Sequence, residues 1–222
     1  MHVDLSLQDL CTKARKAGAC DIVDEILEKY SSVQAIIDGN PERASEWAYW
    51  YARHVIKGRW PEGESAIMTS PWWAYQYARH VIKGRWPEAE SVIMKDSKWA
   101  YRYACNVIKD RWPEAEPVIM TSPEWAYWYA LDVIKGRWPE AESVIMEDPG
   151  WACRYASCAI EGRWPEAEPV IMKDPKWAYW YALYVIRARW PEAESVIMAD
   201  PGWADLYQTI IIGVSGKKGT TE

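Results

Sequence analysis

Apolar residues recur along the chain in two alternating patterns, one long and one short. The long pattern, W-A-Y-x-Y-A-x-x-V-I-K, places its constant apolar residues on one side of an α-helix in which each residue turns about 100°. The short pattern, P-E-A-E-S-V-I-M, is long enough for about two helical turns. The polarity of the chain therefore predicts a long helix followed by a short one.

This pair of patterns recurs every 26 residues. The first Trp of each copy stands at Trp47, Trp73, Trp99, Trp125, Trp151, Trp177 and Trp203. A fixed period of about 20–50 residues is typical of solenoids, in which each unit buries its apolar face only against its neighbours. The sequence predicts an all-α fold, a right-handed α-solenoid of six to seven repeats, each with a long α-helix and a short α or 3₁₀ helix.

The repeats divide the chain into three predicted parts. Residues 1–46 are expected to form an N-terminal helical cap, with helices over 6–17 and 20–30 and a degenerate short element over 32–38. Residues 47–212 form the repeat solenoid. Residues 213–222 are small and polar, which is typical of a flexible tail.

The long helices have recognisable start signals. Five copies begin after Ser or Asp followed by Pro, which combines an N-cap side chain with a proline at the first helical position. These pairs are Ser70-Pro71, Ser122-Pro123, Asp148-Pro149, Asp174-Pro175 and Asp200-Pro201. Asn40-Pro41 takes this place in the first copy, and Asp96-Ser97 keeps the cap without the proline.

Glycine marks the predicted end of four long helices. Gly58, Gly84, Gly136 and Gly162 suit a left-handed C-terminal cap. Asp110 and Ala188 replace the glycine in the other two full copies. We expect those two helix ends to be less regular.

Proline also shapes the short element. Trp before Pro forces an extended residue ahead of a new helix start. Pro117 and Pro169 fall inside the element, where an α-helix tolerates proline badly. We expect one turn of 3₁₀ helix or a short α-helix that starts late. Glu62, Glu64 and their copies lie where a helix N-terminus favours negative charge.

Comparison of the copies with one another predicts which side of the long helix is buried. Counted from the first Trp, positions 2, 5, 6, 9 and 13 share one side; position 2 is always Ala, position 5 always Tyr, and position 14 is Trp in all full copies. Positions 4, 7, 8 and 11 lie on the opposite arc and vary. We expect the constant positions to form the core and the variable ones the surface. Arg59 and its copies, at position 13, are expected to pair with the repeated Glu or stack on Trp.

Charge changes the picture of the variable arc. The formal net charge of −6 counts against wholesale binding of nucleic acid or membrane. Positions 4, 7, 8 and 11 nevertheless carry nine cations and two anions over the six full repeats. The arc is thus a basic stripe that also presents aromatic rings. Its candidate binding residues are Trp50, Arg53, His54, Gln76, Arg79, His80, Arg102, Trp128, Arg154, Trp180 and Tyr184.

The sequence lacks the patterns on which catalysis depends. Carboxylate pairs such as Glu140 and Glu142 are two residues apart and point in different directions on a helix. His54 and His80 belong to stacked helices expected to lie about 8–10 Å apart, too far for an easy shared metal site. Phosphate-binding glycine loops and nucleophile motifs are absent. We expect no enzymatic activity, no metal site and no cofactor.

Cysteine usage and hydropathy indicate the compartment. The five Cys do not follow the repeat and are interpreted as reduced thiols in a cytosol; Cys153 and Cys158 are expected to face different ways, which disfavours zinc. Residues 1–10 lack the features of a signal peptide, and no run of about 18 apolar residues occurs. We expect a cytoplasmic protein that does not enter membranes.

The motif itself is familiar. The frame W-A-Y-x-Y-A…R-W-P-E-A-E resembles short tandem repeats in hypothetical proteins of tailed phages and bacteria. The phasing D-P-x-W-A-x-x-Y-A is similar to the leucine-rich repeat variant, a solenoid that alternates an α-helix with a 3₁₀ turn. The present unit is longer and uses aromatic residues where that family uses small aliphatic ones. The resemblance implies a superhelix and nothing catalytic.

Three functional hypotheses follow. The first is a non-enzymatic scaffold that binds a protein partner through the variable face; if phage-encoded, it would act on a host protein in the host cytoplasm. Exposed Trp, Tyr and Arg are typical of binding hot spots. The second is binding of single-stranded nucleic acid along the basic and aromatic stripe. The third is self-assembly, with a homodimer formed through the C-terminal end of the stack, where residues 210–212 lie beside an incompletely capped repeat.

Overall fold

The computed structural model describes residues 7–8, 11–12 and 32–213, and these residues form helices and short connections with no strand. The chain divides into two compact units, residues 1–109 (unit 1) and 110–222 (unit 2). The helices expected over 6–17 and 20–30 lie almost entirely outside the described residues, as does the tail from 214 onwards. The short element expected over 32–38 is α3, Val33–Asp38.

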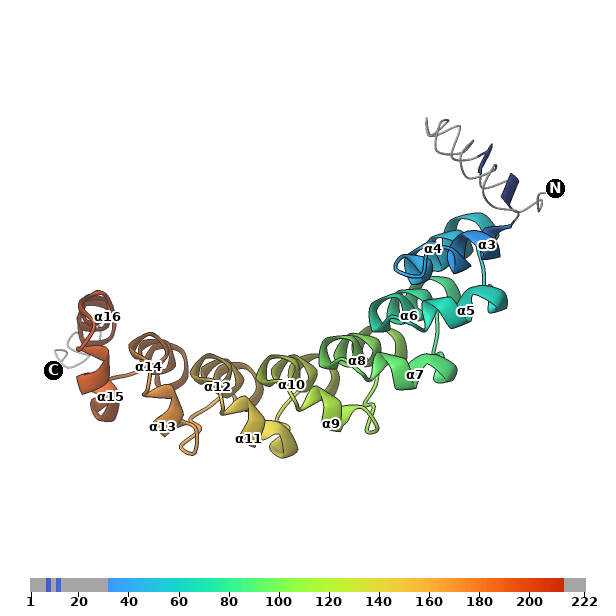
Figure 1. Ribbon diagram of the computed structural model, residues 1–222. Helices are drawn as coiled ribbons and strands as arrows, with labels where there is room; N and C mark the ends of the chain where they lie inside the picture. Colours follow the sequence, from blue (N-terminus) through green and yellow to red (C-terminus); the bar gives the residue numbers. More distant parts are fainter. Residues whose placement is uncertain (1–6, 9–10, 13–31, 214–222) are drawn as a thin grey trace. The chain divides into compact units, whose positions relative to one another are not determined.

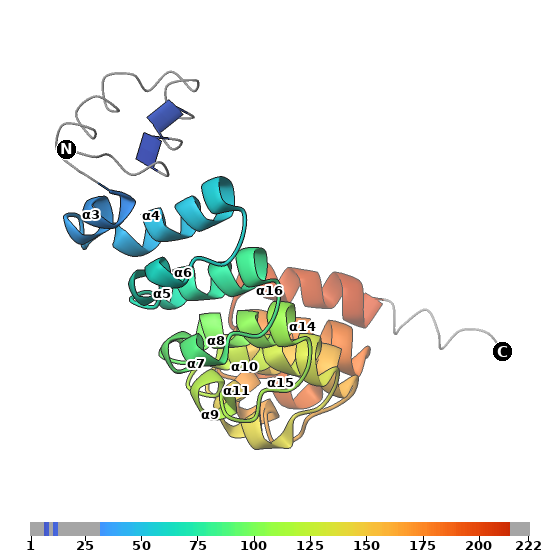
Figure 2. The same cartoon turned by 90° about the vertical axis from the view of Figure 1, so that its right-hand side faces the viewer.

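Unit 1 alternates long and short helices. Each long helix has an α-helical first half (an α label) and a π-helical second half (an η label). In order, the elements after α3 are α4 Ala44–Tyr51 with η1 Ala52–Ile56, α5 Pro61–Ile67, α6 Pro71–Tyr77 with η2 Ala78–Ile82, α7 Pro87–Ile93, and α8 Ser97–Tyr103 with η3 Ala104–Ile108. Helices α4 and α6 contact their own short helices, α5 and α7, and each contacts the next long helix; Figure 2 shows α4 and α6 lying one above the other.

Unit 2 repeats the same arrangement (Figure 1). Its long helices are α10 Pro123–Tyr129 with η4 Ala130–Ile134, α12 Pro149–Tyr155 with η6 Ala156–Ile160, α14 Pro175–Tyr181 with η7 Ala182–Ile186, and α16 Pro201–Leu206 with η8 Tyr207–Ile212. Its short helices are α9 Glu116–Ile119, α11 Glu142–Ile145 preceded by the 3₁₀ turn η5 Pro139–Ala141, α13 Glu168–Ile171, and α15 Pro191–Ile197. The long helices α10, α12, α14 and α16 contact one another in sequence. Both units therefore confirm the predicted all-α solenoid of 26-residue repeats.

The second half of each long helix departs from the predicted α geometry. In the six full repeats five residues, from the Ala at position 6 to the Ile at position 10, wind as a π-helix. The backbone N–H of Lys109, for example, donates to the carbonyl of Ala104 at 2.7 Å. The expectation of a continuous α-helix was wrong here because a single widened turn leaves no periodic signal in the sequence. Such segments are rare and often mark functional sites.

In each full repeat, the residue with positive φ that follows the π segment is a charged residue and not a glycine. Position 11 has φ between 58° and 63° in every full repeat. These residues are Lys57, Lys83, Lys109, Lys135, Glu161 and Arg187. The prediction that Gly58 and its copies adopt the left-handed conformation was therefore wrong by one residue.

The position after the left-handed residue has room for a side chain, so packing does not require the glycine there. A Cβ added to Gly58, Gly84, Gly136 or Gly162 would meet no atom within 4 Å. Asp110 and Ala188 therefore fit this position. The ends at Lys109 and Arg187 keep the left-handed φ, at 60° and 58°. They lack the hydrogen bond that the backbone N–H of each glycine donates to the carbonyl of position 6, as Gly58 does to Ala52 at 3.2 Å, so the expectation that these two ends are less regular is confirmed for their hydrogen bonding.

The constant positions of the long helix form the core. The Ala residues at positions 2 and 6 and the Tyr at position 5 are buried in every full repeat, together with position 3. The position-14 side chains Trp86, Trp112, Trp138, Trp164 and Trp190 are each 1% exposed. Position 9 is only half-buried and position 13 is exposed, although both were expected on the core side. The π turn changes the helical phase at position 9, and the helix ends before position 13.

Most predicted helix starts are confirmed. The carboxylates of Asp96, Asp148, Asp174 and Asp200 accept hydrogen bonds from backbone N–H groups in the first turn of their helices. Ser122 makes no side-chain cap bond. In the first copy the expected Asn40-Pro41 start was wrong. Helix α4 begins at Ala44 with Arg43 as its N-cap, and the side-chain amide of Asn40 donates to the carbonyl of Ile36 at the end of α3.

The short helices vary as their prolines predict. Helices α5, α7 and α15 start at the Pro that follows Trp. In the copies with Pro117 and Pro169, α9 and α13 start late, at Glu116 and Glu168, so the proline lies in the first turn. The remaining copy has one 3₁₀ turn, η5, before α11.

Candidate binding surface

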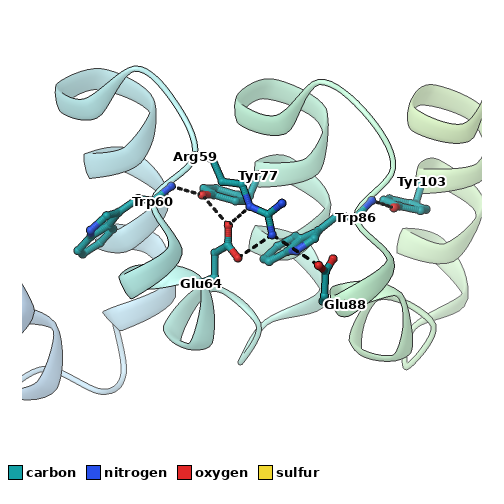
Figure 3. A network of polar contacts seen from close by, with 7 residues as sticks. All are labelled: Arg59, Trp60, Glu64, Tyr77, Trp86, Glu88 and Tyr103. Carbon is teal, nitrogen blue, oxygen red and sulfur yellow. Dashed lines mark hydrogen bonds and ion pairs between the residues drawn. The ribbon is translucent and has the colours of Figure 1, made fainter.

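A polar network joins each repeat to the next (Figure 3). The guanidinium of Arg59 donates from Nε and Nη2 to the two carboxylate oxygens of Glu64, at 2.6 and 3.1 Å. The hydroxyl of Tyr77, from the following repeat, donates to Glu64 Oε1 at 3.2 Å and accepts the backbone N–H of Trp60 at 2.6 Å. The tyrosine therefore connects a helix start and an ion pair across the repeat boundary.

The network recurs at every repeat boundary from Arg59 onwards. Its further copies are Arg85, Trp86, Glu90 and Tyr103; Arg111, Trp112, Glu116 and Tyr129; Arg137, Trp138, Glu142 and Tyr155; Arg163, Trp164, Glu168 and Tyr181; and Arg189, Trp190, Glu194 and Tyr207. The predicted pairing of Arg with Glu is confirmed. The bridging tyrosine hydroxyl was not predicted, although Arg, Glu and Tyr are constant at their positions.

Burial and hydrogen bonds shift the pKa values of two members of this network. Burial raises the pKa of Tyr77 to about 12, against the opposing effect of the hydrogen bond from Trp60. The hydrogen bond to Glu64 raises the pKa of Arg59 above its usual value. The Tyr77 hydroxyl therefore stays neutral and keeps the proton that it donates to Glu64. Glu62 and Glu64 also lie in the first turn of α5, where the helix favours negative charge. Glu64 thus has a structural role.

The variable positions of the long helix remain accessible. No side chain at positions 4, 7, 8 or 11 of the six full repeats is buried. Trp50 is 43% exposed and Tyr184 is 54% exposed, whereas Trp128 and Trp180 are partly buried and less exposed than either. The predicted phase of this face is therefore confirmed, and the two later tryptophans contribute less free ring surface than Trp50.

In unit 1 this face holds three neighbouring hollows, which we call hollows A, B and C. Hollow A, of about 360 Å³, is lined by Arg53, His54, Lys57, Gly58, His80, Val81 and Lys83. Hollow B, of about 370 Å³, is lined by Trp72, Tyr75, Gln76, Arg79, His80, Lys98, Trp99 and Arg102. Hollow C, of about 190 Å³, is lined by Arg79, Lys83, Gly84, Asn106, Val107 and Lys109. The candidate residues from Arg53 to Arg102 in unit 1 thus come together.

Neighbouring rings hold the basic side chains in place. Arg79 donates from Nη1 to the Tyr75 hydroxyl at 2.7 Å, and Arg53 makes the equivalent bond to Tyr49. Trp50 stacks on His54, with ring centroids 4.7 Å apart. These contacts orient the charges without neutralising them, because a tyrosine hydroxyl is an uncharged partner.

The corresponding face of unit 2 has a different character. Trp180 stacks on Tyr184 with centroids 5.2 Å apart and an interplanar angle of 2°, and its edge meets Trp203. The guanidinium of Arg154 lies 4.6 Å from the Trp151 ring centroid. Asp132 and Glu161 introduce acidic groups that the unit 1 face lacks. The candidate residues of unit 2 thus form aromatic clusters with mixed charge.

The structure also places the two histidines and two of the cysteines named from the sequence. His54 and His80 both line hollow A, but among the described residues no group of three or more His, Cys, Asp or Glu is arranged to hold a metal ion. Cys153 is buried, which raises its pKa to about 12, and Cys158 is exposed, so the two face different ways. In the part of the chain that the structure covers, every helix is too short or too polar to cross a membrane.

Comparison with known proteins adds no family. Searches against protein-family models, curated proteins and solved structures find no match to the chain. The resemblance to phage and bacterial repeats thus rests on the motif alone, and function has to be argued from the residues.

Proposed function

We propose that this chain is a non-enzymatic repeat scaffold that binds a protein partner through the variable face of its long helices. One observation carries the proposal: positions 4, 7, 8 and 11, which differ between repeats, are all accessible, while the constant Ala and Tyr of the same helices are buried. Packing accounts for the constant residues. It does not account for the choice of side chains on the accessible face.

The composition of that face favours a protein ligand. Trp, Tyr and Arg dominate binding hot spots because they supply large contact areas together with directional polar groups. Trp50 and Tyr184 expose such rings in unit 1 and unit 2, respectively. We place the protein in the cytoplasm on its cysteine usage, and in the host cytoplasm if it is phage-encoded.

Binding of single-stranded nucleic acid is the second candidate. The unit 1 face has six cations and no anion at positions 4, 7, 8 and 11, which suits phosphate groups. The rings beside these cations are less suitable for base stacking. Trp72 and Trp99 already contact each other with centroids 4.4 Å apart, and Tyr75 stacks on Trp99. A protein ligand therefore fits this face better.

Self-association is the third candidate. In the last long helix, Leu206 and Ile210 are 38% and 39% exposed. Sedimentation of the chain over a range of concentrations decides whether this surface pairs two copies. A monomer at all concentrations would eliminate this candidate.

The proposed function can be tested without knowledge of the natural partner. The immobilised chain is used to select from a displayed library of random peptides, in parallel with the variant Trp50→Ala/Tyr184→Ala and the control variant Lys95→Ala/Lys173→Ala. Lys95 and Lys173 are exposed, but they lie outside the variable face. We expect wild type and control to enrich the same peptides and the first variant to lose them. Absence of enrichment by the wild type, or equal enrichment by all three proteins, would contradict the proposal.

A further inference from the structure

Hollows A, B and C form one continuous surface in unit 1. His80 lines both A and B, Lys83 lines both A and C, and Arg79 lines both B and C. The surface therefore crosses the long helices of three successive repeats. We call it the basic groove.

The lining of the basic groove has cations but no carboxylate. Arg and Lys contribute to all three hollows, and no Asp or Glu lines any of them. Outside the groove, two arginines of unit 1 are each paired with a carboxylate. Arg59 donates two hydrogen bonds to Glu64, and Arg85 donates two to Glu90. The chain therefore pairs its structural arginines with glutamate and leaves the groove without one.

The groove disfavours further positive charge. Burial lowers the pKa of His80, and the charges of Arg53 and Arg79 lower it further. A ligand carboxylate in hollow A or B would reverse this electrostatic effect. An anionic ligand is therefore electrostatically complementary to the surface.

The repeat spacing specifies the form of that ligand. Stacked helices lie about 8–10 Å apart, so equivalent cations of successive repeats are separated by a similar distance. A peptide in the polyproline II conformation advances about 3.1 Å per residue and turns once every three residues, so every third side chain points the same way and one turn spans about 9 Å. Carboxylates at every third residue would meet successive groups of groove cations.

We infer that the basic groove binds an extended acidic segment of a protein partner, with Asp or Glu at every third residue. This inference rests on the proposed function and names the chemistry of its ligand. Lys57, Lys83 and Lys109 lie at the same position of the three repeats and are all exposed, so they are the natural partners for three such carboxylates. Trp50 stacks on His54 of hollow A and offers an apolar contact at that end.

The test compares synthetic ligands of equal length by fluorescence anisotropy. The probe is a labelled peptide of about 12 residues, or four polyproline II turns, with Glu at every third position and Ser and Ala between. A second peptide has Gln in place of Glu, and a third has the same composition with its Glu residues clustered at one end. Labelled oligothymidylate of the same number of residues serves as the nucleic-acid competitor.

Two charge-reversal variants are compared, each with glutamate at a position where another repeat already has glutamate. Lys57→Glu/Lys83→Glu changes the groove, and Glu161 occupies the same left-handed position in a later repeat, so the backbone accepts glutamate there. Lys95→Glu/Lys173→Glu changes the net charge equally outside the groove, and Glu147 occupies the equivalent position of another copy. Unchanged far-ultraviolet circular dichroism verifies that both variants are folded.

We expect the peptide with Glu at every third position to bind the wild type, and its affinity to fall as salt increases. The Gln peptide, the clustered peptide and the groove variant should each weaken binding by about tenfold or more, while the control variant should change it by less than about twofold. Equal binding of the groove variant and wild type, no dependence on peptide charge or spacing, or tighter binding of oligothymidylate would overturn the inference. Should library selection still show peptides that depend on Trp50 and Tyr184, the proposed function would stand without the acidic ligand.

Discussion

Removing one bridging hydroxyl should weaken the contact between two repeats in a measurable way. Tyr181 donates to Glu168 Oε1 at 3.1 Å and accepts the backbone N–H of Trp164 at 2.6 Å. In Tyr181→Phe the ring keeps its place against Trp190, whose centroid is 4.9 Å away, so little cavity should form. The main loss is the acceptor of a buried N–H group.

The magnitude follows from that loss. A buried backbone N–H left without an acceptor costs about 1–3 kcal/mol. For a protein of about 150–250 residues, each kcal/mol corresponds to a shift of about 2–4 °C in the midpoint of thermal unfolding. Thermal unfolding followed by circular dichroism should show a decrease within these limits. Hydrogen exchange should show the loss of protection concentrated at the boundary between the repeats that start at Trp151 and Trp177, because repeat interfaces contribute locally.

The matched control is Tyr184→Phe. This side chain is 54% exposed, so its substitution should change the free energy of unfolding by less than about 0.5 kcal/mol. Equal destabilisation by Tyr181→Phe and Tyr184→Phe would refute the structural role of the network. The same conclusion would follow if Tyr181→Phe unfolded at the wild-type temperature.

Three further results are expected. Stability should be lost as the pH rises from about 10 through 12, because folding raises the pKa of Tyr77 to about 12 and thus favours its neutral hydroxyl; urea unfolding at a series of pH values measures this. Gly136→Ala should raise the free energy of unfolding by about 0.4–1 kcal/mol, since a Cβ there meets no atom within 4 Å and Ala188 already occupies this position; chemical denaturation would contradict this if stability fell. An acidic peptide should raise the pKa of His80, which burial and then the charges of Arg53 and Arg79 lower in the free chain; a pH titration by nuclear magnetic resonance that shows no rise would place the peptide elsewhere.

The helix phase could be predicted because each repeat provides an independent test of the same position. Ala at position 2 and Tyr at position 5 never change, and a strictly constant side chain in a solenoid indicates packing against neighbouring repeats. The accessible residues at positions 4, 7, 8 and 11 then followed from helical geometry, although the same geometry misplaced positions 9 and 13. This prediction extended to Arg53, Arg79 and Arg102, which the structure brings to one groove.

The sequence-based predictions differ from the structure where the structure depends on contacts beyond one helix. The Tyr77 hydroxyl meets Glu64 across 13 residues and a repeat boundary, and no local pattern indicates which polar partner a core tyrosine selects. The π turn and the left-handed Lys57 depend on carbonyl geometry at the helix end, where Gly58 seemed the better candidate for positive φ. Asn40 does not cap α4, whose N-cap is Arg43, and its side-chain amide instead contacts the carbonyl of Ile36 in α3.

Hydrogen–deuterium exchange of the chain with and without a library-selected peptide locates the binding face most directly. Binding through the variable face should increase protection in the π segments and the residues after them, such as η1, η2 and η3 with their left-handed lysines. The short helices α5 and α7 should change little, because their polar side chains form the inter-repeat network. Protection confined to α5, α7 and their counterparts would contradict the assignment of the variable face as the binding surface.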